Sequence, residues 1–241
     1  MLNNKSIDTL IVGAGFAGMY SLYKQISDGF TSEIYEQGDG VGGTWYWNRY
    51  PGARCDIESM DYSYSFSEEL QQEWNWKQKY GTQPELLDYA NYVCNKFDLK
   101  KNINFNTRII KAKFNKETNK WLVETNKKEL IDCKYLILAT GNLSTPNTPN
   151  IKGINNFKGN IFHTGAWPKK MPDFNEKTVG VIGTGSSGVQ SIPIISEKAK
   201  KLLVFQRTPN FSLPARHSEL PEVKRENYKK DYKKYRQMAK N

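Results

Sequence analysis

The stretch TLIVGAGFAG, residues 9–18, joins a short apolar run to a GxGxxG motif. A helical pattern over residues 16–27 follows it, and a second apolar strand over residues 33–36 comes next. In such a unit the first glycine permits the tight turn, the second lets the backbone approach a pyrophosphate, and the third allows close helix–strand packing. The free N–H groups at the helix N-terminus then face the phosphates. The stretch therefore predicts a Rossmann-like dinucleotide-binding unit.

The same arrangement occurs a second time in TVGVIGTGSSG, residues 178–188. We expect a helix over residues 186–197 and a further strand over residues 202–205, which read LLVF. A glycine-rich turn in an ordinary α/β unit is the alternative for either copy. Because a strand and a helix frame each motif, two dinucleotide sites are the preferred interpretation.

The residue at the end of each second strand indicates which dinucleotide the unit binds. Glu36 holds this place in the first unit, where a carboxylate accepts hydrogen bonds from ribose hydroxyls and repels a 2′-phosphate. Arg207, followed by Thr208, holds it in the second, where a guanidinium and a hydroxyl suit a 2′-phosphate. We therefore predict FAD or NAD at the first site and NADP at the second, with a surface strand-end arginine as the alternative for Arg207. FAD with NADPH is the simplest pair, the layout of a flavin enzyme reduced by a nicotinamide.

The composition excludes several classes of protein. The 241 residues carry a net charge of +10, 38% of them are hydrophobic, and the mean hydropathy is −0.71. No apolar run is long enough to span a membrane, and the N-terminus resembles neither a signal peptide nor a transit peptide. The basic residues are spread along the chain without an arginine cluster, so we expect no nucleic-acid partner and no membrane partner.

The cysteines indicate the compartment. Cys55, Cys94 and Cys133 are far apart, form no CxxC, and with only two histidines give no metal-ligand pattern. We predict reduced thiols, no bound metal and a cytoplasmic location.

The sequence between the two motifs has a different texture. Residues 66–100 are mostly of helical pattern, and residues 103–133 alternate like strands about a turn at 116–119. Residues 135–139 are a continuous apolar run of the kind found in central parallel strands, and a Pro- and Asn-rich linker covers 141–159.

The fold class that follows is α/β, with two Rossmann-like dinucleotide-binding units of the glutathione-reductase type, the second incomplete. We predict an FAD-binding domain over residues 1–150, the start of an NADP-binding domain over 151–216, and a basic helical tail over 217–241. Tyr228, Tyr232 and Tyr235 would form an aromatic stripe on this tail, expected to be a solvated helix.

A specific resemblance begins at residues 42–56, GGTWYWNRYPGARCD. Aromatic rings here can stack on a flavin with Asp56 beside it, and an aromatic packing loop is the alternative. The run resembles a fingerprint of the type I Baeyer–Villiger monooxygenases, GxWxxxx(F/Y)PGxxxD. Their second fingerprint, FxGxxxHxxxW before Pro or Asp, is met by residues 157–168, FKGNIFHTGAWP, and Ala139-Thr140-Gly141 also matches. The Trp167-Pro168 pair favours this branch over the related flavin-containing monooxygenases.

The resemblance covers the chain to about residue 215 and implies roles for individual residues. It implies that FAD is bound by Gly13, Gly15, Phe16, Ala17, Gly18, Glu36, Thr44, Trp45, Asp56, Tyr62 and Ile109, the last on a central strand. It implies that NADP is bound by Arg54, Thr184, Gly185, Ser186, Ser187, Gly188, Gln190, Arg207 and Thr208. Asp56 is the implied catalytic residue, as partner of an active-site arginine, and His163 would lie in a hinge between the domains.

The resemblance also implies a reaction. NADPH reduces FAD, the reduced flavin reacts with O₂, and one oxygen atom is inserted beside the carbonyl of a small ketone to give an ester or lactone. Family members are roughly twice as long, and their active-site arginine follows the second unit, beyond Asn241 of this chain. We therefore expect an N-terminal portion of such an enzyme, with activity on its own left open. The alternatives are a non-catalytic dinucleotide-binding remnant, one half of a split flavoprotein completed by a second chain, and an NADPH-dependent flavin reductase or oxidase.

Overall fold

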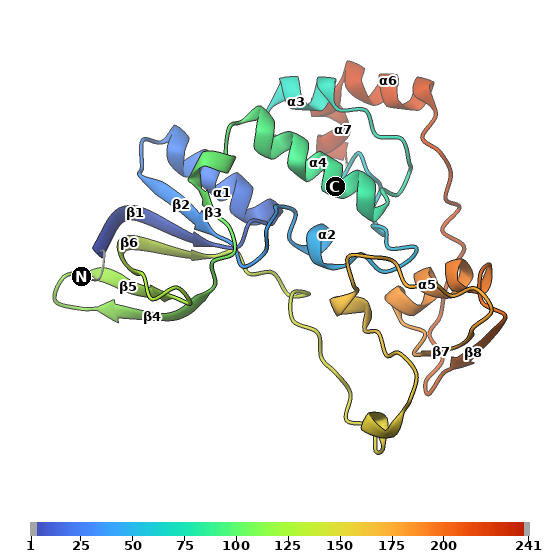
Figure 1. Ribbon diagram of the computed structural model, residues 1–241. Coiled ribbons are helices and arrows are strands. Elements are labelled where there is room, and N and C mark those ends of the chain that lie inside the picture. Colours follow the sequence, from blue (N-terminus) through green and yellow to red (C-terminus); the bar gives the residue numbers. More distant parts are fainter. Residues whose placement is uncertain (1–3, 239–241) are drawn as a thin grey trace. The chain divides into compact units, whose positions relative to one another are not determined.

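The computed structural model describes residues 4–238 (Figure 1). Its contacts divide the chain into two compact units, each built from two segments. Unit 1 consists of residues 1–47 and 87–145, and unit 2 of residues 48–86 and 146–241, apart from the few terminal residues outside the description.

Unit 1 is built on a six-stranded sheet of order β3-β2-β1-β6-β5-β4. The strands β1, β2, β3 and β6 run parallel, and β5 and β4 continue the sheet antiparallel beyond β6. Their bounds are β1 Asn4–Val12, β2 Ser32–Tyr35, β3 Ile103–Asn104, β4 Ile109–Asn115, β5 Lys120–Thr125 and β6 Leu130–Leu138. The expected central strand at 135–139 is confirmed as the end of β6, which pairs along β1.

The position expected for Ile109 is wrong. Ile109 opens β4, which pairs only with β5 among the described strands and so forms an edge of the sheet. After Ile109 every residue of the strand is exposed, and the strand carries lysines, which discourage edge-to-edge pairing. An alternating pattern does not reveal whether a strand has one neighbour or two.

Helices of unit 1 cover one face of this sheet. They are α1 (Phe16–Ser27), as expected, the short α2 (Thr44–Trp47), and α4 (Gln83–Lys96), whose residues from Leu87 onward belong to this unit. Met19 and Leu22 of α1 and Ala90 of α4 pack with Ile11 and Ile34 of the sheet in one buried cluster. A one-turn 3-10 helix, η1 (Lys100–Asn102), precedes β3.

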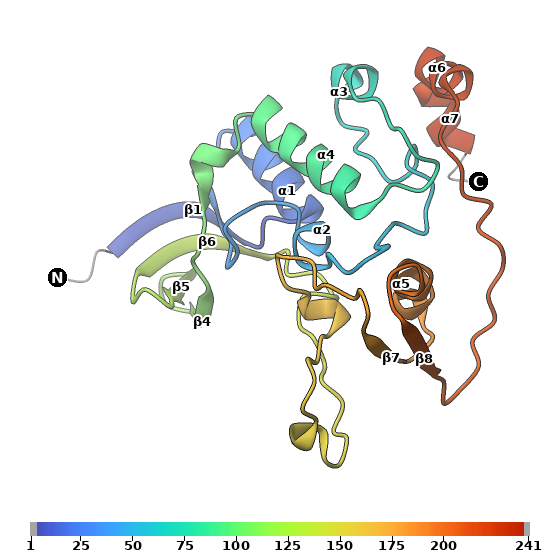
Figure 2. The same ribbon diagram turned by 45° about the vertical axis from the view of Figure 1, so that its right-hand side comes forward.

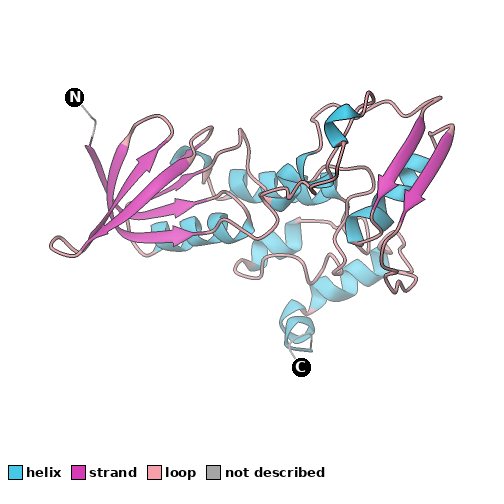
Figure 3. Ribbon diagram, turned by 90° about the horizontal axis from the view of Figure 1, so that it is seen from below, coloured by secondary structure: helices cyan, strands magenta, loops and turns pink. Residues whose placement is uncertain are grey.

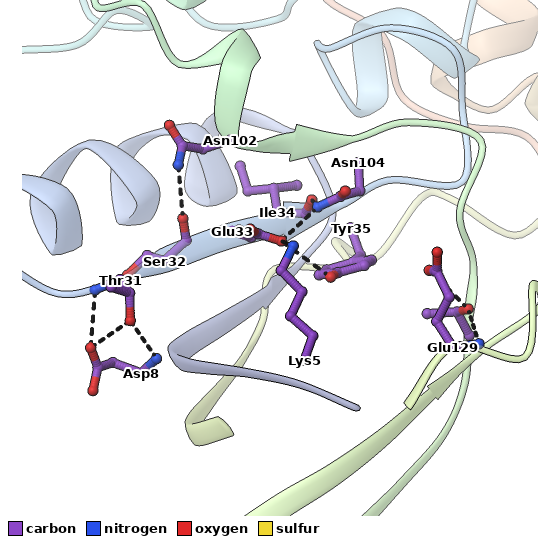
Figure 4. Close-up of polar contacts among 11 residues, drawn as sticks. Lys5, Asp8, Thr31, Ser32, Glu33, Ile34, Tyr35, Asn102, Asn104 and Glu129 are labelled. Atoms are coloured by element: carbon purple, nitrogen blue, oxygen red, sulfur yellow. Dashed lines mark hydrogen bonds and ion pairs between the residues drawn. The ribbon is translucent and has the colours of Figure 1, made fainter. Parts of the chain in front are cut away.

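Polar contacts fasten the parallel strands to one another (Figure 4). One oxygen of Glu33 accepts hydrogen bonds from Lys5 Nζ at 2.5 Å, Asn104 Nδ2 at 2.9 Å and the Tyr35 hydroxyl at 3.2 Å. The carboxylate thereby joins β1, β2 and β3 at the surface.

Unit 2 contains a two-stranded parallel sheet, β7 (Thr178–Ile182) with β8 (Lys201–Phe205), crossed by α5 (Ser186–Ser196). Both sheets are drawn in Figure 3. Val179, Val181 and Leu202 pack on the α5 side with Ile195 and Trp167. The second unit is thus the strand–helix–strand beginning of a Rossmann unit, which confirms that it is incomplete. Two further one-turn helices are η2 (Ile154–Asn156) and η3 (Thr164–Ala166).

The helical pattern of residues 66–100 is confirmed only in part. Helices α3 (Glu68–Glu73) and α4 are separated by residues 74–82, which contain no helix. Trp76 in this interval is buried, so its aromatic run is packed rather than helical.

The expectation of a solvated tail helix is wrong. The tail forms two helices, α6 (Glu222–Lys230) and α7 (Tyr232–Met238), separated at Asp231, which has φ −151° and ψ 69°. Tyr232 is only 8% exposed, and both helices lie beside the α3 segment (Figure 2). The last residues of the predicted tail, 239–241, lie outside the described residues. None of the helices within residues 4–238 combines the length and the apolar character needed to cross a bilayer.

Candidate dinucleotide-binding sites

The first glycine-rich loop is a tight turn between β1 and α1. Gly13 has φ +102°, and a Cβ there would lie 2.6 Å from the Ala139 carbonyl oxygen. A Cβ on Gly18 would lie 1.9 Å from the Gly13 carbonyl oxygen, so the helix packs directly on the turn. Gly15 is the N-cap of α1 and provides no side-chain cap. The first turn therefore presents N–H groups and the positive end of the helix dipole to an anion.

The Glu36 carboxylate lies buried beside this loop, at the end of β2. Its Oε2 accepts a hydrogen bond from the Ala14 amide at 2.8 Å, and its Oε1 accepts one from the Gly38 amide at 2.7 Å. Each oxygen retains a lone pair for a further donor such as a ribose hydroxyl. The carboxylate is thus held in place next to the phosphate-binding turn.

The start of the first fingerprint closes over the same loop. The Gly42 amide donates to the Ala14 carbonyl oxygen at 3.0 Å, and a Cβ on Gly43 would lie 2.8 Å from the Gly15 Cα. Gly43 has φ +53°, which also favours glycine. The backbones of Gly15 and Gly43 touch here with no side chain between them. Gly43 is followed by Thr44, the first residue of α2.

The aromatic run has a packing role for at least one of its members. The Tyr46 ring packs on Gly38 and Gly40, and its hydroxyl hydrogen-bonds with the Asp39 carboxylate. Trp45 is also buried. The packing-loop alternative therefore applies to Tyr46.

The second glycine-rich loop repeats the geometry of the first in unit 2. Gly183 has φ +101°, and its amide donates to the Phe205 carbonyl oxygen at 2.9 Å. A Cβ on Gly188 would lie 2.4 Å from the Gly183 carbonyl oxygen, whereas one on Gly185 would meet nothing within 4 Å. Gly185 is the N-cap of α5, again without a side-chain cap. The open space at Gly185 is the approach that a pyrophosphate requires.

Two amide side chains that the motif analysis missed hold this second loop. Gln206 Nε2 donates to the Thr184 hydroxyl at 2.7 Å, and Asn210 Nδ2 donates to the Thr184 carbonyl oxygen at 2.9 Å. Both follow β8 and flank Arg207 and Thr208, which are exposed. The only sequence signal for these two residues was their position after the second strand of the unit. Amide side chains in a loop form no distinctive sequence pattern.

The Pro-Gly segment of the first fingerprint is tied to α5 within unit 2. Gln190 Oε1 accepts from the Tyr50 hydroxyl at 2.8 Å, and Gln190 Nε2 donates to the Arg54 carbonyl oxygen at 3.0 Å. Gly52 has φ +79°, and a Cβ there would lie 2.2 Å from the Gln190 carbonyl oxygen. The Gln190 carboxamide therefore joins two sequence motifs, a role that the spacing of the motifs did not reveal.

The remaining predicted site residues differ in exposure. Asp56 is exposed and Tyr62 is half-buried; both belong to unit 2. His163 Nδ1 accepts a hydrogen bond from the Gly165 amide at 3.0 Å and caps η3, a structural role. Trp167 packs into the core of unit 2 with Phe174 and Ile195.

The thiols are unreactive by their surroundings. Burial raises the pKa of Cys55, Cys94 and Cys133, so each is protonated at neutral pH. No disulfide joins these three residues, and the described residues contain no cluster of metal ligands.

The residues present fit two dinucleotides. At each loop a glycine N-cap leaves the helix N-terminus open, and the positions that must lack a Cβ for the turn to close are glycines. The class of protein defined by this fold is an α/β protein with two dinucleotide-binding loops of opposite strand-end charge. The chain belongs to the flavin-binding monooxygenase-like family, whose model matches residues 6–219.

Curated relatives agree with this assignment. The chain is 42% identical over 236 residues to cyclohexanone 1,2-monooxygenase of an Acinetobacter species, covering 97% of this chain and 43% of that protein. It is 46% identical over 208 residues to a Baeyer–Villiger monooxygenase of Pseudooceanicola batsensis, covering 86% of this chain and 38% of that protein. The chain thus spans less than half the length of these relatives.

Solved structures agree as well. An oxidised steroid monooxygenase bound to NADP matches with a TM-score of 0.94 and 50% identity, over 97% of this chain and 45% of that one. The complex of OTEMO with FAD and NADP matches with a TM-score of 0.89 and 42% identity, over 94% and 44%. The family resemblance seen in the two fingerprints and the predicted fold class are confirmed.

Proposed function

We propose that this chain is the N-terminal portion of an FAD- and NADPH-dependent monooxygenase of the Baeyer–Villiger type, which converts a small ketone into an ester or lactone with O₂. The supporting observation is the contrast between the two strand-end residues. Glu36 places a buried carboxylate beside the first loop, and Arg207 follows the equivalent strand beside the second. Opposite charges at equivalent positions suit two different dinucleotides.

FAD is the proposed ligand of the first loop. The α1 N-terminus at Gly15, Phe16 and Ala17 would bind the pyrophosphate, and Glu36 would accept hydrogen bonds from the ribose of the adenosine. Thr44 and Trp45 would lie along the flavin, together with Asp56 and Tyr62. Ile109 would contact the adenine region from the first residue of its edge strand.

NADP is the proposed ligand of the second loop. Residues 184–188 would cradle its pyrophosphate, and Arg207 and Thr208 would bind the 2′-phosphate. Gln206 and Asn210 would keep Thr184 in position for this contact, because both donate to it. Arg54 would approach the nicotinamide. Gln190 would hold the Arg54 backbone in place and would also contact NADP itself.

When bound, the two cofactors supply the hydride and activate the oxygen. The chain binds and orients them: the uncapped helix N-termini hold the pyrophosphates, and Glu36 and Arg207 select which dinucleotide enters each loop. Asp56, the proposed catalytic residue, supplies a negative charge that would hold a guanidinium near the reacting atoms. The family resemblance implies that this guanidinium belongs to polypeptide that follows the second unit.

We propose that a further polypeptide completes both units, either a continuation of this chain or a second chain. In unit 1, β5 pairs with β6 only from Leu130 to Cys133, which leaves one edge of the remaining β6 residues unpaired among the described strands. In unit 2, Ile182 is 73% exposed and Phe205 55% exposed on the sheet side away from α5. Unpaired edges and exposed apolar side chains are features that proteins normally cover.

The test is the absorbance spectrum of the purified chain after gel filtration with FAD, followed by NADPH oxidation assays with and without cyclohexanone as probe. Flavin that co-elutes with the chain, and NADPH oxidation that rises with the ketone once the C-terminal part of a relative is added, are the expected results. Flavin binding without turnover even then favours a non-catalytic remnant. NADPH oxidation that ignores the ketone favours a flavin reductase or oxidase, and no flavin under any condition rejects the proposed function.

Two further proposals concern the domain boundaries and the location of the protein. The domain boundaries near residues 150 and 216 remain proposals, as does a cytoplasmic location. Three free, buried cysteines support a reducing compartment, where such thiols persist.

A further inference from the structure

Helix α7 contacts the chain on both sides of Tyr62. The Tyr232 hydroxyl lies 3.9 Å from the Met60 sulfur, and burial together with the nearby Asp61 carboxylate raises the pKa of the Tyr235 hydroxyl. Arg236 hydrogen-bonds with Ser63 and Tyr64, the two residues that follow Tyr62. Three of the five residues from 60 to 64, namely Met60, Ser63 and Tyr64, are therefore contacted by a helix more than 160 positions later in the chain.

The Arg236 guanidinium is the centre of this contact. Its Nη2 donates to the Ser63 hydroxyl at 2.8 Å and to the Tyr64 carbonyl oxygen at 3.2 Å, while its Nε donates to Gln71 Oε1 at 2.9 Å. The Ser63 hydroxyl donates in turn to the Met60 carbonyl oxygen at 2.9 Å. The N–H groups of the planar guanidinium thus donate to several partners at once, and they join the loop before α3 to α3 itself.

The rest of the tail fastens the same region. The Lys79 amide donates to the Ser218 carbonyl oxygen at 3.0 Å, and the Leu220 amide donates to the Lys77 carbonyl oxygen at 2.8 Å. Lys233 forms an ion pair with Glu68 at 2.9 Å, but both side chains are largely exposed, so this pair adds little. The contacts from the tail to the loop of residues 60–64 are those of the buried Tyr232 and the Arg236 guanidinium, whereas the backbone pairing fastens the tail to residues 77–79.

The held loop includes a turn that carries Tyr62. The Asp61 and Tyr62 amides both donate to the Glu58 carbonyl oxygen at 2.9 Å. The Tyr62 backbone is therefore bonded directly to Glu58 on one side and is followed by two residues, Ser63 and Tyr64, that Arg236 contacts. This turn begins two residues after Asp56.

We infer that α7, through Arg236, is a positioning element that sets the loop of residues 60–64 and with it Tyr62, one of the residues proposed to contact the flavin. The inference rests on the proposed function for its flavin part. It assigns Arg236 a positioning role, since the guanidinium acts through the loop.

The experiment compares Arg236→Ala with Arg236→Lys, Tyr235→Phe and the control Lys234→Ala in the full chain. Lys234 lies on the same helix with an exposed side chain. The first readout is amide hydrogen exchange at Asp61 and Tyr62, which needs no cofactor. The second is the visible spectrum and affinity of bound FAD, which reports on the side chains around the flavin.

We expect Arg236→Ala to speed exchange at both amides by about tenfold and to weaken FAD binding by about tenfold, with a shifted flavin spectrum. Arg236→Lys should recover part of both effects, because an ammonium keeps the charge but not the fork. Tyr235→Phe should act in the same direction more weakly, and it supplies the test if Arg236→Ala does not fold. Lys234→Ala should match the parent.

Unchanged exchange in Arg236→Ala and Tyr235→Phe overturns the inference, and so does an equal effect of Lys234→Ala. Faster exchange with an unaltered flavin spectrum and affinity also overturns it, since the loop would then not act on the flavin. If the parent chain binds no flavin, the proposed function fails; the exchange readout then still decides whether α7 orders the loop, while the assignment to a flavin site is rejected.

Discussion

At the scale of single residues, the two strand-end side chains differ in what surrounds them. Glu36 is buried and already accepts two backbone N–H groups, so its charge is held in a defined place. Arg207 is exposed after β8, in a loop whose neighbouring amides fix Thr184. The first residue is part of the loop structure, whereas the second has an exposed side chain.

Replacing Glu36 with glutamine should weaken FAD binding by roughly tenfold and lower the stability of unit 1. The substitution removes the charge and points an NH₂ group at the Ala14 or Gly38 amide, and hydrogen bonds to a charged group contribute about 1.5–3 kcal/mol. Flavin titration and urea unfolding measure the two effects. Glu117→Gln, at an exposed turn, is the control. Equal FAD affinity in both variants would contradict the role of Glu36.

Replacing Arg207 with serine should lower the preference for NADPH over NADH by about 10- to 100-fold, because a charge-assisted pair with the 2′-phosphate is lost. Unfolding should change by less than about 0.5 kcal/mol, since the side chain is exposed. Dissociation constants for both nucleotides, compared with Arg216→Ser, measure the effect. A parallel loss of NADPH and NADH binding would count against 2′-phosphate recognition.

At the scale of elements, the second glycine-rich loop contains one glycine that the packing requires and another that faces open space. In the second loop a Cβ on Gly188 collides with the turn, whereas one on Gly185 meets open space. The strand–turn–helix unit therefore needs the former glycine to fold, and the proposed NADP site assigns the latter to binding.

Gly188→Ala should lower the unfolding free energy of unit 2, by about 1–3 kcal/mol as for other overpacked sites. Gly185→Ala should leave stability nearly unchanged and weaken NADP binding, because the new methyl group occupies the approach of the pyrophosphate. Thermal unfolding and NADP titration of the two variants form a matched pair. Equal stability losses would show that the space at Gly185 is not open.

A cysteine on strand β6, Cys133, should make the stability of the folded chain depend on pH. Burial raises the pKa of Cys133 from its ordinary value near 9 to about 11. Below pH 9 the thiol is protonated in both folded and unfolded chains; between pH 9 and 11 only the unfolded chain ionises, so stability falls as pH rises through this window. The loss from this group amounts to about 2–3 kcal/mol.

Cys133→Ala should therefore flatten the decline of unfolding free energy between pH 9 and 11 relative to the parent, although its stability at neutral pH is lower because a buried sulfur is lost. Urea unfolding at several pH values measures both slopes. Parallel slopes would mean that Cys133 does not contribute. Tyr232, whose pKa burial raises to about 12, adds a similar loss above pH 10 in both proteins.

At the scale of the whole molecule, both compact units expose apolar side chains on their sheets. The exposed Ile182 and Phe205 lie on the uncovered side of the β7–β8 sheet, and Leu138 at the end of β6 is 66% exposed. The chain spans 43–46% of the solved relatives it matches.

Ile182→Glu combined with Phe205→Glu should leave the unfolding free energy within about 1 kcal/mol of the parent, because exposed side chains contribute little to a core. The same variant should reduce concentration-dependent self-association and binding of an apolar fluorescent dye. Sedimentation velocity and dye fluorescence provide the measurement. Unfolding of the variant would show instead that this face is packed within the chain.

What the sequence by itself determined is local. The two glycine-rich loops, helix α1 and the parallel strand at the end of β6 follow from backbone requirements of glycine and from apolar periodicity within a few residues. The family assignment follows from fingerprints of similar local character. The roles of Glu36, Arg207 and the other site residues stay predictions, since no contact with a cofactor is part of the structure.

Only the tertiary structure decided which segments meet. It placed Ile109 on an edge strand, joined Gln190 to the Pro-Gly segment, and docked Tyr232 and Arg236 on the loop around Tyr62. The contacts of Gln190, Tyr232 and Arg236 join residues separated by more than 130 positions. A one-dimensional pattern records the periodicity of each partner but not the pairing between them, because pairing depends on long-range packing and hydrogen bonds that only the folded chain brings together.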